Sequence, residues 1–197
     1  MKKEPTIEEV KKFYDLEHTK HQSKWLHKSN PRIRDVLQFA IPQIRSGKYS
    51  TLLDLGCGVG IITKALAEYM PTIMAIDLSE SNIATAQEYK SHRNIIYNSG
   101  DFTRMTLGGP YNVVCAFDVV EHIRPSDRDA FLLNARLHCN GIMLVAIPNP
   151  EVIVKLRETD PERLQIVDEP VYDTDFPMFT IHKKLSVGKY IYYILKP

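Results

Sequence analysis

The sequence is poor in cysteine, in long apolar runs and in unbalanced charge. Its three cysteines, Cys57, Cys115 and Cys139, are far apart in the chain, and their number is odd. A disulfide framework or a zinc-binding module needs paired or closely spaced cysteines, so we expect neither. Free thiols are typical of a reducing compartment, and we therefore expect a cytoplasmic protein.

No apolar run approaches the ~20 residues of a membrane span, and no apolar segment typical of a secretion signal follows Met1. The chain carries 25 basic and 24 acidic residues, which argues against a protein built wholly around phosphate neutralisation. Residues 1–50 carry eleven basic and six acidic side chains, and the rest of the chain has a small acidic excess. We therefore expect no membrane or nucleic-acid partner, although the basic segment favours an acceptor of acidic character.

What remains is a globular composition, with 44% hydrophobic and 25% charged residues in a chain of 197. This length suits a single domain that folds without a metal or a disulfide. From residue 50 onward, short apolar runs alternate with amphipathic segments, which indicates a parallel sheet covered by helices on both faces. The expected strands are 51–55, 73–76, 95–97, 113–117 and 142–147, and the expected helices are 60–69, 80–91 and 126–138.

Both flanks of this alternating region have their own patterns. Thr6 and Glu9 form a capping-box pattern, and Asn30 before Pro31 is a second helix start, so the first 45 residues read as helical. After residue 148, a helix is expected near 150–158. A terminal hairpin is expected from 178–182 and 189–195.

A glycine loop follows the first expected strand, in the segment DLGCGVG that begins at Asp54. Glycine allows positive φ and close approach of a ligand to the main chain. The Gly-Lys-Ser/Thr of a phosphate-binding loop is absent, and Ile61 stands where a dinucleotide fingerprint has its third glycine.

Acidic residues mark the ends of the next two strands. Asp77 ends the run 73–77, where a carboxylate can accept hydrogen bonds from a ribose diol. Asp101 and Phe102 follow the third strand, where they suit an adenine amino group and ring. Because ligands bind beyond the carboxyl ends of such strands, these markers predict one nucleoside-containing ligand.

Four segments together resemble class I S-adenosylmethionine (SAM) dependent methyltransferases: LDLGCGVG, AIDLS, GDF and FDVVEHI. The resemblance covers about residues 50–147 and is of the small-molecule type. It implies an α/β fold, a Rossmann-like doubly wound sheet of seven strands, mostly parallel with one antiparallel edge strand, and N-terminal helices. Fold alone does not name the methyl acceptor.

The resemblance also implies roles for individual residues. Asp54 and Gly56 would hold the amino and carboxylate groups of the methionine part, and Asp77 the ribose hydroxyls. The full cofactor site it implies comprises Asp54, Gly56, Cys57, Gly58, Gly60, Asp77, Leu78, Asp101, Phe102, Phe117 and Asp118.

Catalytic candidates follow the fourth strand, in the segment that faces the methyl group in this family. His122 is the first choice for a base, because its unperturbed pKa is near neutrality. Glu121 is its neighbour, and His182 in the expected hairpin is a further candidate. Asp118, Glu121 and His122 are also residue types that bind hard metals, and Glu-His pairs occur at this position in metal-assisted relatives. Because many metal-free relatives share the pair, we expect a site without metal, with a divalent metal as the less favoured alternative.

The flanks are expected to build the acceptor pocket. We divide the single domain into a helical lid (1–48), a cofactor-binding core (49–147), and a substrate loop with the terminal hairpin (148–197). Tyr14 and His18 on the lid and Tyr172 in the loop are the candidate acceptor contacts.

The sequence therefore predicts methyl transfer to an oxygen or nitrogen atom of a small metabolite, by in-line displacement. Positioning alone contributes roughly 7–11 kcal/mol to such a step. Two alternatives stay open: an RNA or protein methyltransferase, which the basic N-terminal segment favours, and a SAM-binding module without catalysis.

Overall fold

The computed structural model describes residues 3–20, 24 and 30–197. Its centre is a seven-stranded sheet with the order β3-β2-β1-β4-β5-β7-β6. The strands are β1 Thr51–Leu55, β2 Thr72–Asp77, β3 Ile95–Ser99, β4 Tyr111–Phe117, β5 Cys139–Pro148, β6 Thr180–Val187 and β7 Tyr190–Lys196. The first five pair in parallel, whereas β7 is antiparallel to both β5 and β6. The expected hairpin, β6 with β7, thus forms the edge of the sheet next to β5. Its second strand, β7, lies between β5 and β6, and β6 is the edge strand.

Both helix starts that the sequence predicts in the N-terminal segment have their capping residues. Thr6 and Glu9 form a complete capping box, and Asn30 caps a helix that has Pro31 at its first position. The helical elements are α1 Ile7–Phe13, η1 Tyr14–His18, α3 Pro31–Ser46, α4 Ile61–Leu66, α5 Glu80–Lys90, η2 Val120–His122, α6 Pro125–Leu137, α7 Pro150–Thr159, η3 Pro161–Arg163 and η4 Asp173–Asp175.

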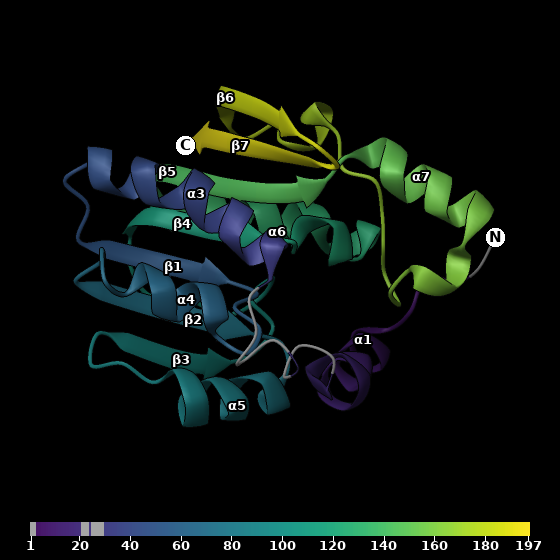
Figure 1. Ribbon diagram of the computed structural model, residues 1–197, viewed down its shortest axis with the longest axis horizontal. Helices are drawn as coiled ribbons and strands as arrows, with labels where there is room; N and C mark the ends of the chain where they lie inside the picture. Colours follow the sequence, from purple (N-terminus) through teal and green to yellow (C-terminus); the bar gives the residue numbers. More distant parts are fainter. Residues whose placement is uncertain (1–2, 21–23, 25–29) are drawn as a thin grey trace.

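Alternate residues of the central strands enter two separate cores. Leu52 and Val113 pack on the face that α3, α4 and α5 cover, and Figure 1 shows α3 and α4 in front of the sheet. Leu53 and Val114 pack on the opposite face with Phe131 of α6. Because both faces are covered, the central strands β1, β4 and β5 are mostly apolar, as is typical of a parallel sheet.

The direction of winding reverses between β1 and β4, which are neighbours in the sheet but not in the chain. In such sheets ligands bind outside the carboxyl ends of the strands at this reversal. Figure 1 shows α1 and α7 beyond these strand ends, so the two flanks of the sequence meet at this edge. None of the helices in the described part of the chain has the length and apolar character of a membrane span.

Candidate functional site

A cavity of about 650 Å³ lies at this edge of the sheet. Strand ends, the lid and the segment after β5 all contribute to its wall. Its volume is in the range of sites for small ligands. The sequence-predicted residues on the wall are Tyr14, Gly56, Cys57, Gly58, Asp77, Leu78, Asp101, Phe102, Phe117, Asp118, Glu121 and His122.

The glycine loop adopts the conformation that its composition predicts. Gly56, Gly58 and Gly60 have φ values of +73°, +55° and +76°. A Cβ atom on Gly56 would lie 2.4 Å from Cγ2 of Val119, so glycine is needed there for space as well as for backbone angle. Gly60 lies away from the cavity, where a Cβ atom would meet the hydroxyl of Tyr97 at 2.6 Å.

Asp54 is buried beside the loop and is not on the cavity wall that the described residues form. Its carboxylate accepts a 2.6 Å hydrogen bond from the hydroxyl of Thr63 in α4. Burial raises the pKa of Asp54 to about 7. In this structure Asp54 therefore joins β1 to α4.

Asp77 is a well-supported acceptor at the end of β2. Its carboxylate accepts hydrogen bonds from the backbone N–H groups of Gly58 (2.8 Å) and Ser79 (2.9 Å) and from Nδ2 of Asn82 (3.0 Å). A carboxylate has about four acceptor positions, so capacity for a further donor remains. The same side chain thus fixes the glycine loop and faces the cavity.

Asp101 and Phe102 lie on the wall after β3, as expected. Asp101 accepts bonds from the backbone N–H and the hydroxyl of Thr103 (3.0 and 2.6 Å), which closes the turn. Phe102 is buried against Phe131, with ring centroids 5.5 Å apart. Asp101 thus gives the cavity wall a polar group, and Phe102 gives it an apolar surface.

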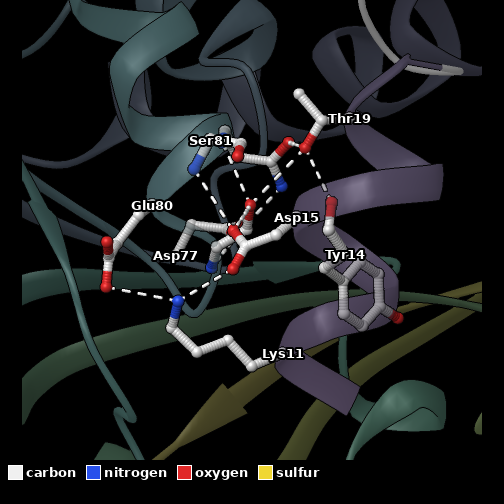
Figure 2. A network of polar contacts seen from close by, with 9 residues as sticks. Lys11, Tyr14, Asp15, Thr19, Asp77, Glu80 and Ser81 are labelled. Carbon is white, nitrogen blue, oxygen red and sulfur yellow. Dashed lines mark hydrogen bonds and ion pairs between the residues drawn. The ribbon is translucent and has the colours of Figure 1, made fainter. Parts of the chain in front are cut away.

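The lid is held to the start of α5 by a polar network, which Figure 2 shows. Asp15 accepts hydrogen bonds from the hydroxyl of Ser79 (2.7 Å) and the N–H of Ser81 (3.2 Å). Lys11 pairs with Asp15 (2.8 Å) and with Glu80 (3.2 Å).

A second contact leads from the lid to Asp77 on the cavity wall. The hydroxyl of Thr19 donates to Oδ1 of Asn82 (2.7 Å), and Asn82 donates to Asp77. Tyr14 lies on the cavity wall, and the side chain of His18 lies outside the described part of the chain.

Asp118 is anchored by an arginine that sequence reasoning missed. It has a φ of +56°, which is uncommon for a residue other than glycine. Arg32, in the first turn of α3, donates two hydrogen bonds to its carboxylate (2.9 and 2.5 Å) and stacks on Tyr190 at 3.5 Å. Arg32 comes 86 residues earlier in the chain. The sequence signal around it, Asn30-Pro31, marks only a helix start.

Glu121 is the most unusual group on the wall. It is fully buried, and neither carboxylate oxygen has a hydrogen-bond partner among the described residues. Burial raises the pKa of Glu121 to about 8, against an opposing effect of His122. A buried, unpartnered carboxylate is costly and points to a missing donor.

His122 is surrounded by the segment that follows α7. Its Nδ1 atom lies 2.8 Å from both the carbonyl oxygen of Val167 and Oδ1 of Asp168. Its Nε2 atom lies 3.2 Å from Nε2 of Gln165 and 3.9 Å from Oε1 of Glu121. Burial alone lowers the pKa of His122, but the charges of Glu121 and Asp168 outweigh it and raise the pKa to about 9.

Two predicted residues lie elsewhere. His182 is exposed on β6, and Tyr172 is 51% exposed before η4; neither is on the cavity wall that the described residues form. Gln165 and Asp168 were missed, because the polar segment after α7 has no motif. Within the described residues, no group of three His, Cys, Asp or Glu side chains is arranged to hold a metal ion.

Comparison with known proteins finds relatives of this chain. Relatives include ubiquinone biosynthesis O-methyltransferases from Caulobacter sp. strain K31 (33% identical, covering 63% of this chain and 54% of the relative) and Bradyrhizobium sp. strain ORS 278 (31%, 72% and 61%). The chain thus spans about half the length of the curated relatives it matches.

Solved structures share the fold. Magnesium protoporphyrin IX methyltransferase from Synechocystis PCC 6803, with bound SAH (S-adenosylhomocysteine), has a TM-score of 0.74 at 17% identity, covering 96% of this chain and 97% of that one. N-methyltransferase NodS from Bradyrhizobium japonicum WM9 has a TM-score of 0.75 at 15% identity, covering 94% and 97%. The model of the methyltransferase domain family matches residues 20–180. Since that match covers most of the chain, the protein belongs to the methyltransferase domain family, whose motifs its sequence resembles.

Proposed function

We propose that this protein binds SAM and transfers its methyl group to a hydroxyl oxygen of a small organic acceptor. The observation that carries the proposal is one cavity whose wall holds both groups of predicted residues. Gly56, Gly58 and Asp77 line one part of its wall, and Glu121 and His122 line another. Similarity to the O-methyltransferases described above supports oxygen as the target.

The wall fits the parts of SAM by chemistry. Asp77 has capacity for a ribose hydroxyl beside its three present donors, and Asp101 with Phe102 suits the adenine. The open main chain of the glycine loop suits the methionine part. Asp54 would act on that part only through the loop, since its carboxylate is buried and does not line the cavity that the described residues form.

The acceptor would lie between α7 and the lid. Val152, Ile153 and Leu156 of α7 give this part of the wall an apolar surface, and Val10 adds to it from α1. Arg32 is already paired with Asp118, so we infer a neutral reacting end. An acidic group farther along the acceptor would meet exposed basic side chains on the wall, such as Lys189.

SAM supplies a methyl group that is activated by the positive charge on its sulfur. The acceptor oxygen loses its proton to the Glu121–His122 pair and gains the methyl carbon, while the sulfur keeps the electrons of the broken bond. Burial raises the pKa of Glu121, and the charges of Glu121 and Asp168 raise the pKa of His122, so the pair keeps its protons to a higher pH than free side chains do. A neighbouring positive charge would lower both values and free the pair to accept a proton. Such proton transfer contributes typically 10²–10⁴-fold.

Calorimetry with SAM and SAH tests the cofactor, comparing wild type with Asp77→Ala. Loss of hydrogen bonds to a charged group predicts binding weaker by about 10- to 100-fold. Asp129→Ala, an exposed change on α6, should leave affinity unchanged. A mass-spectrometric screen of hydroxylated acceptors then tests transfer. Wild-type protein that binds neither compound would contradict the proposal, as would normal binding with no acceptor methylated.

A further inference from the structure

The imidazole of His122 is contacted directly by residues 165–168, and through Gln165 it is linked to Tyr14. Val167 and Asp168 approach Nδ1 from the segment after η3, both at 2.8 Å. Gln165 of the same segment lies 3.2 Å from Nε2, and the hydroxyl of Tyr14 in the lid donates to Oε1 of Gln165 at 3.0 Å. His122, which follows β4, is therefore joined to residues 165–168 and, through them, to the lid.

The partners of Nδ1 determine which nitrogen titrates. A carbonyl oxygen and a carboxylate oxygen only accept hydrogen bonds, so Nδ1 carries a hydrogen in either charge state of the ring. The proton that His122 gains or loses is then on Nε2, the atom 3.9 Å from Glu121. A hydrogen-bonded carboxylate orients a histidine base in this way in other enzymes.

Asp168 is itself fixed at its second oxygen. Oδ2 accepts a 2.6 Å hydrogen bond from the backbone N–H of Gln165, which closes the turn. The N–H of Glu169 donates to the carbonyl of Glu121 (2.9 Å), and Arg157 of α7 donates to the carbonyl of Asp168 (2.6 Å). The turn is thus joined both to the catalytic candidates and to the acceptor-lining helix.

We propose that Asp168 is a positioning residue for His122: it keeps hydrogen on Nδ1 and leaves Nε2 to take the acceptor's proton. This inference rests on the proposed methyl transfer. It assigns a role to the segment after α7, which lines the cavity and completes the proton-accepting group in one turn.

Replacement of Asp168 by asparagine is a direct test. Both oxygens of Asp168 accept hydrogen bonds, one from the N–H of Gln165 and one from Nδ1 of His122. The NH₂ group of an asparagine would therefore face one of these two donors. Asp168→Asn must either open the turn or favour hydrogen on Nε2. The charged groups that act on His122 besides Asp168 are Glu121 and, through Glu121, Asp118; the hydroxyl of Tyr14 reaches it through Gln165.

Histidine-labelled protein gives a readout that does not depend on activity. Nitrogen NMR, with the His122 signals assigned from their loss in His122→Gln, reports the protonated nitrogen and the titration. Above the pKa of His122, where the ring is uncharged, we expect the wild-type ring to carry its hydrogen on Nδ1. In Asp168→Asn we expect a lower pKa of His122 or the other tautomer. An uncharged wild-type ring with its hydrogen on Nε2, or a variant in which His122 titrates as in wild type, would overturn the inference.

Activity provides the second readout. Asp168→Asn and Asp168→Ala should lower kcat by about 10²- to 10⁴-fold, the range of general-base contributions, with an unchanged SAM affinity and a displaced pH profile. Glu169→Gln is the matched control, because its carboxylate pairs with Arg157 instead. If wild type methylates nothing, the proposed function fails, and the NMR result still decides the role of Asp168.

Discussion

At the scale of single residues, the site is built from carboxyl groups held in unfavourable surroundings. Burial raises the pKa of Asp54 to about 7 and that of Glu121 to about 8. Asp54 has Thr63 as a hydrogen-bond donor, whereas the oxygens of Glu121 have none among the described side chains and backbone. Such a group costs stability and is retained where a ligand or a proton completes it.

Glu121→Gln should reduce the loss of stability on raising pH. The pKa of Glu121 is about 8 in the folded protein against an ordinary value of 4.5, so the folded state retains a proton that the unfolded chain releases. Stability therefore falls as pH rises from 4.5 through 8. A tenfold difference in proton affinity between the two states corresponds to about 1.36 kcal/mol, so the effect reaches several kcal/mol.

Thermal melts without SAM between pH 5 and pH 9 measure this effect. His122 acts in the same direction, since its pKa rises from 6.5 to about 9, and loss of Glu121 removes part of that rise. Glu158→Gln, an exposed change in α7, should keep the wild-type slope. An unchanged slope in Glu121→Gln would show that its ionisation does not limit stability.

At the scale of elements, the glycine loop and the strand ends set the shape of the cofactor side. The N–H groups of Gly56 and Cys57 both donate to the carbonyl of Ile76, at 2.8 and 3.0 Å. The loop is thereby attached to β2, just before Asp77. Two elements that are separate in sequence form one rigid wall.

Gly56→Ala should destabilise this wall more than a glycine replacement elsewhere. The new Cβ would meet Val119 at 2.4 Å and would sit at a φ of +73°. Strain and overpacking predict a loss of about 1–3 kcal/mol. Gly188→Ala in the hairpin is the matched control, with a φ of +58° and no atom within 4 Å.

Urea melts give the stability of each variant, and calorimetry gives its SAM affinity. In Gly188→Ala the free energy of unfolding changes only through the backbone angle. The additional loss of stability in Gly56→Ala therefore measures the contact with Val119. We expect Gly56→Ala to lose SAM affinity and Gly188→Ala to retain it. Equal losses in the two variants would argue against a close-packed loop.

At the scale of the whole molecule, residues 3–20 and the segment after β5 meet over the sheet edge. The lid reaches Asp77 through Thr19 and Asn82, and it reaches His122 through Tyr14 and Gln165. Both parts of the cavity therefore depend on the same short segment of chain.

Thr19→Val should loosen the lid and weaken SAM binding together. The change keeps the shape and removes the hydroxyl that donates to Asn82, a buried residue. A lost hydrogen bond of about 1 kcal/mol corresponds to about three- to tenfold weaker binding. Hydrogen exchange over residues 3–20 should accelerate, and Thr159→Val, at the end of α7, should change neither quantity. Faster exchange with unchanged affinity would show that lid and cofactor site are independent.

Much of the fold follows from the sequence because it depends on local patterns. The apolar runs predict the core strands, and the caps at Thr6 and Asn30 predict the helix starts, as the structure confirms. The glycine loop and Asp77 could be placed because strand ends share one edge of a parallel sheet. The sequence predicts the terminal hairpin, but only the strand pairing shows that β7 lies between β5 and β6.

The sequence by itself determined the class of fold, the edge of the sheet that carries the site, and the family. The tertiary structure decided which residues meet there. Arg32 with Asp118, and Asp168 with His122, are joined across long separations in the chain, and His182 and Tyr172 lie away from the cavity. Local periodicity cannot specify such pairs, because a contact between distant residues depends on how whole elements pack rather than on any spacing in the chain.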